Sequence, residues 1–145
     1  MSIKQESAAN IFNKGFNCAQ SVISVFCEDY GMDKKTALKI SGGLGGGFRS
    51  GDICGAVSGA VLVIGLKYGH HTEGDFDTKQ NCNAKTVEFL SEFKARNKAI
   101  TCREILECDI STPEGMEQAK NKNLFKTKCV DMVKDAVSIL EKLGY

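Results

Sequence analysis

The chain has 145 residues, of which 42% are hydrophobic, one is proline and none is tryptophan. This length suits one domain with its own hydrophobic core, and the composition excludes a disordered or fibrous chain. The 19 basic and 18 acidic residues give a net charge of +1 and are interspersed, so the basic stripe of a nucleic-acid-binding protein is missing. We therefore expect a single domain over residues 1–145 and no nucleic-acid partner.

The seven cysteines are a high and odd number, which does not fit a fully paired disulfide framework. The first seven residues contain Glu6 and no apolar run, so we expect no secretory signal and a cytoplasmic protein. The longest apolar stretch, residues 53–66, is shorter than the ~20 residues that a transmembrane helix needs, and we expect no membrane span. The cysteines therefore need an explanation other than extracellular cross-linking.

In the N-terminal part, apolar residues recur at helical spacing between Ser7 and Tyr30. This pattern predicts one long helix with Cys18 at the edge of its buried face. Gly31 is expected to end that helix, and a short second helix should follow from Asp33 to about Ile40. Residues 41–51 then contain six glycines, which predict a loop whose backbone can approach another group closely.

A third helix is expected over residues 53–68, with Asp52 as its N-cap and Cys54 in its first turn. A short β-strand in the second half of this segment is the main alternative, because several residues there are β-branched. Gly55 and Gly59 belong to a row of small residues at helical spacing. We interpret this row mainly as a packing face that lets a second helix come close.

In the C-terminal part, a helix is expected over residues 77–97 after a capping pattern at its start. The sequence Thr101-Cys102-Arg103-Glu104 is a capping box, which places its cysteine at the first position of a short helix. Thr112 followed by proline indicates another helix, and residues 125–143, with Cys129 among them, predict the last one. We expect an all-α, single-domain bundle of five or six helices with the glycine-rich loop between the second and third helices.

Cys54 and Cys102 are both expected near a helix N-terminus, where free backbone N–H groups and the helix dipole favour a thiolate. A free cysteine has a pKa of ~8.5, so a modest reduction would make either thiol nucleophilic at neutral pH. A single buried cysteine is more often a small hydrophobic residue, and this explanation suits Cys27 and Cys108. Cys82 lies in a polar stretch and is interpreted as an incidental exposed thiol.

No Cys-x-x-Cys pair occurs, which excludes a zinc ribbon, a ferredoxin-type motif, a thioredoxin-type dithiol and a covalent haem attachment site. Any shared cysteine site must therefore be assembled by the fold. Four different expected helices carry Cys18, Cys54, Cys102 and Cys129, and they could converge at one end of a bundle. No serine-histidine-aspartate or paired-carboxylate pattern stands out, so the sequence leaves open whether the protein is an enzyme.

Several segments together form a specific pattern. They are Phe16–Gln20, the glycine-rich loop, Cys54–Gly59, Gly65–Gly69, Cys102–Leu106, and Cys129 with Val130 and Val133. Through these segments, which span nearly the whole chain, the sequence resembles the C_GCAxxG_C_C family of redox-active proteins, which is defined by four cysteines. The family looks related to the iron–sulfur domain of split-Soret cytochromes.

The resemblance implies a redox role and picks out Cys18, Cys54, Cys102 and Cys129. Four thiolates could hold an iron–sulfur cluster for electron transfer, or a zinc ion. The same four cysteines could instead form redox-active disulfides, with Cys54 or Cys102 as the attacking thiolate. A structural or partner-binding bundle without a cofactor is the third interpretation.

The backbone of Gly45, Gly46 and Gly47 is expected to approach the sulfur site, where its N–H groups would tune a reduction potential. The glycine-rich loop matches neither the G-x-G-x-x-G nor the Walker pattern, so nucleotide binding is disfavoured. His70 and His71 are adjacent in a polar loop and are not assigned as ligands. We expect a redox partner protein, and a homo-oligomer is compatible with the sequence.

Overall fold

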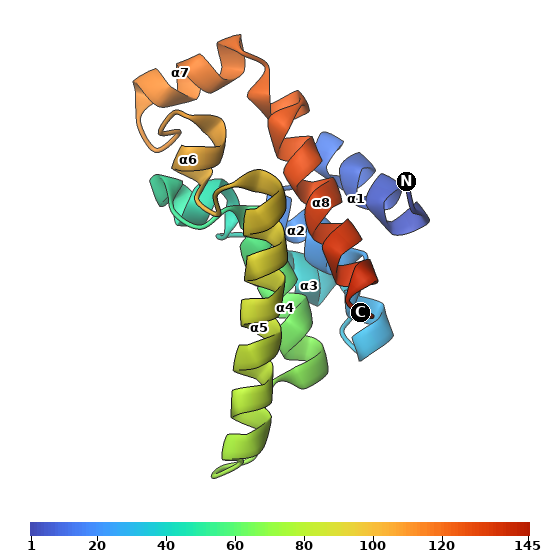
Figure 1. Cartoon of the computed structure of the whole chain (residues 1–145). Coiled ribbons are helices and arrows are strands. Elements are labelled where there is room, and N and C mark those ends of the chain that lie inside the picture. The colour runs from blue at the N-terminus through green and yellow to red at the C-terminus, as the bar shows by residue number, and fades with distance from the viewer.

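The computed structural model describes residues 1–145 and contains helices but no β-strand (Figure 1). The eight α-helices are α1 (Ile3–Asn13), α2 (Cys18–Ser24), α3 (Lys34–Ile40), α4 (Gly55–Tyr68), α5 (Phe76–Asn97), α6 (Cys102–Leu106), α7 (Pro113–Asn121) and α8 (Lys128–Lys142). Three short turns complete the set: η1 (Cys27–Tyr30), η2 (Gly47–Gly51) and η3 (Leu124–Lys126). The all-α fold is confirmed, with more helices than the five or six expected.

The single helix expected over residues 7–30 is two helices with a break at Gly15, where φ is +105°. Asn17 then starts α2 with a capping box: its side chain accepts a hydrogen bond from the Gln20 N–H, and the Gln20 side chain accepts one from the Asn17 N–H. The helical spacing of apolar residues continues across the break and conceals it. As a consequence, Cys18 is the first residue of a helix.

The segment 61–64 belongs to α4, so the alternative of a β-strand is excluded. Cys54 is the N-cap of α4, and the prediction that Asp52 has this role is wrong. The carbonyl of Asp52 instead accepts a hydrogen bond from the chain far downstream, at Cys102. The packing interpretation of the small residues holds, because a Cβ at Gly59 would lie only 2.7 Å from the carbonyl oxygen of α2 residue Ala19.

The core lies where α2, α4, α5 and α8 meet, and α4 runs beside α5 (Figure 1). Its largest fully buried side chains include Phe26, Phe89, Phe93, Ile23, Ile64, Ile139 and Leu140. Outside this core, α6 lies against η2, and this contact joins the glycine-rich segment to the second half of the chain. No helix of the structure is both long and apolar enough to span a membrane.

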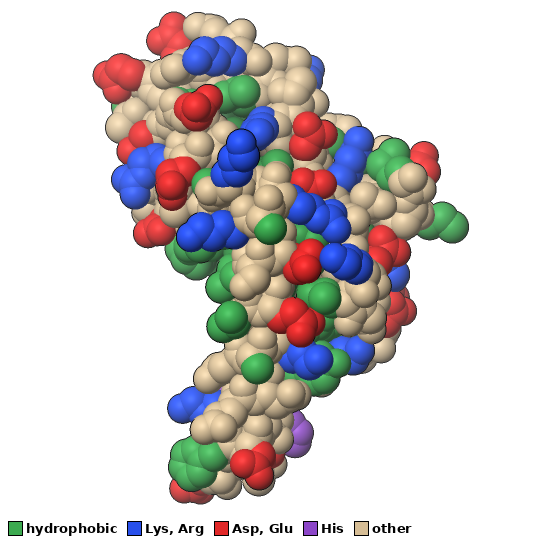
Figure 2. All heavy atoms as spheres, viewed as in Figure 1, with side chains coloured by type: hydrophobic (Ala, Val, Ile, Leu, Met, Phe, Trp, Pro, Cys, Tyr) green, Lys and Arg blue, Asp and Glu red, His purple; other side chains and the backbone are tan.

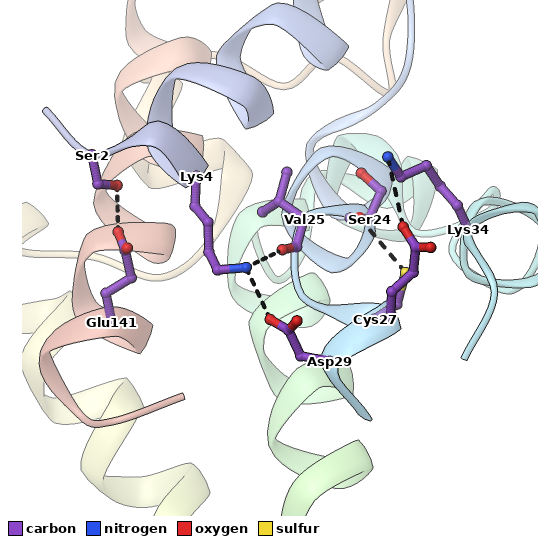
Figure 3. A network of polar contacts seen from close by, with 9 residues as sticks. Ser2, Lys4, Ser24, Val25, Cys27, Asp29, Lys34 and Glu141 are labelled. Carbon is purple, nitrogen blue, oxygen red and sulfur yellow. Dashed lines mark hydrogen bonds and ion pairs between the residues drawn. The ribbon is translucent and has the colours of Figure 1, made fainter. Parts of the chain in front are cut away.

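Polar contacts secure the N-terminal helix on two sides (Figure 3). The Lys4 ammonium group donates to the Val25 carbonyl at 2.7 Å and pairs with Asp29 at 2.9 Å, which ties α1 to the end of α2 and to η1. Ser2 donates to Glu141 of α8. Elsewhere on the surface, Figure 2 shows acidic and basic side chains interspersed, as their alternation along the sequence predicts.

Candidate four-cysteine site

Four cysteines from distant parts of the chain line one pocket, with a volume of about 160 Å³. They are Cys18, Cys54, Cys102 and Cys129. Cys54 is 6% exposed, Cys102 and Cys129 are each 8% exposed, and Cys18 is partly exposed. Most of the remaining wall is apolar, formed by Phe12, Ile105, Leu106, Ile110, Met116, Phe125 and Met132. The structure thus brings together every cysteine expected at the site, while their role as ligands stays a prediction.

Each of these cysteines lies at the start of a helix. Cys18 and Cys102 are the first residues of α2 and α6, and Cys54 is the N-cap of α4. Cys129 is the second residue of α8. Backbone N–H groups at helix starts have no partner within the helix and can donate to an anion. The pocket is therefore surrounded by four segments whose backbone favours negative charge.

Two backbone hydrogen bonds hold the segments of Cys54 and Cys102 side by side. The Cys54 N–H donates to the Ile100 carbonyl at 2.8 Å, and the Cys102 N–H donates to the Asp52 carbonyl at 2.7 Å. Together they form an isolated antiparallel bridge between residues 53 and 101. This pairing fixes both cysteine backbones without a covalent link.

A close approach of two helices brings Cys18 to Cys54. A Cβ at Gly55 would lie 3.0 Å from the Cβ of Cys18 and 3.2 Å from the backbone nitrogen of Ala19. Such a distance is too short for two unbonded carbon atoms, so glycine is needed beside Cys54 for α2 and α4 to meet at this end. The small residues of α4 therefore also position Cys18 and Cys54 at the pocket.

Burial controls the protonation of the pocket thiols. It raises the pKa of Cys54 to about 11 and, with repulsion from neighbouring sulfurs, that of Cys102 to about 12. The backbone N–H groups that hydrogen-bond to Cys54 only partly oppose this effect. The expectation that a helix N-terminus makes these two thiols acidic is thus wrong, because loss of hydration outweighs the helix start.

Cys18 and Cys129 form an unequal pair. A hydrogen bond between their side chains, together with burial, raises the pKa of Cys18 well above its usual range. The same hydrogen bond lowers the pKa of Cys129. Of the four pocket cysteines, only Cys129 has a lowered pKa. No local sequence pattern indicates this, because its partner lies more than a hundred residues away.

The three other cysteines do not line the pocket. Cys27 is fully buried in the core, where its thiol donates to the Ser24 carbonyl at 3.6 Å (Figure 3). Cys82 is partly exposed on α5, and Cys108 lies just beyond α6. Cys108 is close enough to Cys102 that its charge would raise the pKa of that thiol, but it forms no part of the pocket wall.

The glycine-rich loop contributes two of its three expected residues to the pocket wall. Gly45 and Gly46 border the pocket, and a Cβ at Gly45 would lie 2.5 Å from the Asn17 side chain. Gly47 does not border it. Gly47 has φ +63°, and a Cβ there would overlap the backbone of Asp52, so this residue is required by the shape of the turn.

Arg49 was not among the expected site residues, yet it is the only charged residue in the pocket wall. Its single sequence signal is a cation inside a glycine-rich loop. His70 and His71 lie outside the wall and are exposed. In this structure no three histidine, cysteine or acidic side chains are gathered as ligands of a single metal ion.

The fold and the pocket define a class, all-α proteins with a convergent four-cysteine site. The model of the family described as "Putative redox-active protein (C_GCAxxG_C_C)" matches residues 16–143, and the chain belongs to this family. The matched region contains all four pocket cysteines. No curated protein and no solved structure matches the chain.

Proposed function

We propose that Cys18, Cys54, Cys102 and Cys129 bind an iron–sulfur cluster and that the protein transfers electrons through it. The observation that carries this proposal is the convergence of four cysteine side chains, from four helix starts, on one pocket. A bound cluster would supply one-electron redox chemistry. The residues of this chain would hold it, shield it from water and set the charge around it.

The donor set supports a thiophilic group. The pocket wall contains four cysteines and no histidine, aspartate or glutamate. Soft thiolate ligands select zinc, copper(I) or iron–sulfur clusters over magnesium, calcium or manganese. The chemistry of the wall therefore suits both groups that the family resemblance suggested, an iron–sulfur cluster and zinc, and disfavours magnesium, calcium and manganese.

The size of the pocket favours a cluster over a single zinc ion. With zinc–sulfur distances of ~2.3 Å, four thiolates around one zinc ion lie about 3.8 Å apart and leave no space between them. The whole pocket that the four cysteines help to line has a volume of about 160 Å³, which a single zinc ion would not fill. An engineered protein cavity of ~150 Å³ holds a benzene molecule, so the space suits a ligand of several atoms.

Binding of a cluster by the pocket depends on its apolar walls and on the protonated state of its thiols. Side chains such as Phe125, Ile105 and Met132 line the pocket beside the cysteines and make its surroundings apolar. Because the pKa values of Cys54 and Cys102 are raised to about 11 and 12, their protons must be released on binding. Cys18 is the only one of the four residues that is partly exposed rather than buried, and we propose that a redox partner protein docks on its side of the pocket. We propose the cytoplasm as the compartment, since free thiols stay reduced there.

Anaerobic purification tests the proposal. We expect a coloured protein with iron and acid-labile sulfide, and loss of both in the single variants Cys18→Ser, Cys54→Ser, Cys102→Ser and Cys129→Ser. The control Cys82→Ser removes a thiol outside the pocket and should keep the full content. A wild-type protein without iron, before and after anaerobic reconstitution with iron and sulfide, would refute the cluster; zinc in its place would identify the smaller ligand.

A thiol–disulfide function is the second candidate, favoured by the hydrogen-bonded pair of Cys18 and Cys129. In this case the Cys129 thiolate attacks a disulfide such as oxidised glutathione and releases one glutathione thiolate. Cys18 then displaces the second glutathione, so that two protein thiols lose two electrons to the reagent. Mass spectrometry should show a Cys18–Cys129 disulfide, and its absence after oxidation, with both residues still titrating as thiols, would exclude this function.

A further inference from the structure

Arg49 is an exposed residue that borders the four-cysteine pocket. It is the only charged residue in the wall of the four-cysteine pocket. The three ion pairs of the structure are all made by lysines, so the guanidinium group has no carboxylate partner. It lies over Gly46, where a Cβ would come within 3.0 Å of its Nη1 atom. A permanent positive charge thus stands at the pocket without a counter-ion from the chain.

The backbone around Arg49 is strained in a way that places this side chain. Gly46 and Gly47 have φ values of +66° and +63°, and the next two residues, Phe48 and Arg49, continue at +58° and +59°. Left-handed backbone is unfavourable for a residue with a side chain. Such strain persists only where the surrounding structure holds it, and it is concentrated at functional sites.

The strained turn separates two neighbouring side chains. Phe48 lines an apolar groove together with Leu44 and Ile53, whereas Arg49 lines the cysteine pocket. The turn is held from behind by Gly47, which packs on the backbone of Asp52. Its conformation therefore sends an aromatic ring to one side and a cation to the other.

We propose that Arg49 is the cation that balances the negative charge of the four-cysteine site. This inference rests on the proposed function: four thiolates bring more negative charge than a divalent ion or cluster core cancels, so the occupied pocket needs a positive neighbour. Arginine suits this position because it stays charged at all relevant pH values and is less strongly hydrated than lysine. Arg49 acts on the reduced site most, since reduction adds a further negative charge.

A test in the metal-free, reduced protein asks whether Arg49 attracts negative charge into the pocket. Iodoacetate is an anion and iodoacetamide is neutral, and both alkylate thiolates. The ratio of their rates at Cys18 and Cys129, measured by mass spectrometry, should fall about threefold to fivefold in Arg49→Gln. The ratio at Cys82, which is remote from the pocket, should not change in the same molecules.

Two matched variants distinguish the effect of the Arg49 charge from a structural effect of the substitution. Arg103→Gln removes an equal charge close to Cys102 but outside the pocket wall, and it should leave the ratio unchanged. Arg49→Lys should restore most of the wild-type ratio of alkylation rates. High salt should diminish the difference in this ratio between wild type and Arg49→Gln. An unchanged ratio in Arg49→Gln, or an equal decrease in Arg103→Gln, would overturn the inference.

The loaded protein gives a second readout. The midpoint potential of a reconstituted cluster should become more negative in Arg49→Gln, because the reduced form loses its nearby cation, and it should recover towards the wild-type value in Arg49→Lys. An equal potential in wild type and Arg49→Gln contradicts the inference. If the wild-type protein binds neither cluster nor metal, the proposed function fails, while the alkylation ratio still decides the role of Arg49.

Discussion

At the scale of single residues, Cys54 shows two opposing effects on one thiol. As the N-cap of α4 it receives backbone N–H groups that lower its pKa, and as a residue with only 6% exposure it loses the hydration that a thiolate needs. Burial dominates, and the pKa is raised to about 11. The sequence shows the helix start clearly but not how deeply a cysteine is buried, so it predicts the opposite direction for the pKa shift of Cys54.

The raised pKa of Cys54 predicts that the metal-free protein loses stability at alkaline pH. In the unfolded chain this thiol ionises near its ordinary value of 9.0, while in the folded protein it stays protonated up to about 11. The unfolded state therefore binds fewer protons between these values, and the free energy of unfolding falls as pH rises. At 1.36 kcal/mol for each unit, Cys54 contributes a loss of about 2 kcal/mol by the upper end of the window.

Urea unfolding in reductant at pH 8 and pH 10.5 measures this loss. Other groups also titrate in this range, so the comparison with Cys54→Ser is decisive: the variant should lose less stability than the wild type over the same interval. Equal losses in the two proteins would show that Cys54 ionises at its ordinary pH in the folded state.

At the scale of elements, the crossing of α2 and α4 positions the site. The row of small residues along α4 lets the two backbones approach, and the first residue of α2, Cys18, is thereby carried next to the Cys54 end of α4. The sequence predicted the close approach of some helix from this row. It did not identify α2 as the partner, because the break at Gly15 was hidden by apolar spacing that continues across it.

Two glycines of α4 provide a matched test of this crossing. A Cβ at Gly59 would lie 2.7 Å from the Ala19 carbonyl oxygen, so Gly59→Ala should lower the free energy of unfolding by about 1–3 kcal/mol. Nothing lies within 4 Å of a Cβ at Gly65, and Gly65→Ala should raise it by up to about 1 kcal/mol through helix propensity. Chemical denaturation of both variants checks the prediction, and similar effects at the two positions would contradict the close crossing.

At the scale of the whole molecule, the pocket joins parts of the chain that are far apart in sequence. The four cysteines come from the starts of α2, α4, α6 and α8 and span residues 18 to 129. A group held by all of them binds the folded chain and has no comparable site in the unfolded chain. Binding is therefore coupled to the stability of the entire fold.

Loading should consequently stabilise the protein against urea. At a free ligand concentration one hundred times the dissociation constant, binding to the folded state alone adds about 2.7 kcal/mol. We expect a higher midpoint for the protein reconstituted anaerobically with iron and sulfide than for the metal-free protein. The variant with all four pocket cysteines replaced by serine should show no shift, and an equal shift in that variant would point to binding elsewhere.

The sequence by itself determined the all-α fold and the capped helix start at Cys102, because capping and apolar periodicity are local signals. The family pattern marked the four cysteines that line the pocket. Tertiary structure decided the rest: the bridge between residues 53 and 101, the depth of burial that reverses the pKa of Cys54, and the place of Arg49 at the pocket. These features depend on contacts between residues far apart in the chain, and hydration, charge and close packing act through distances in space that local patterns do not encode.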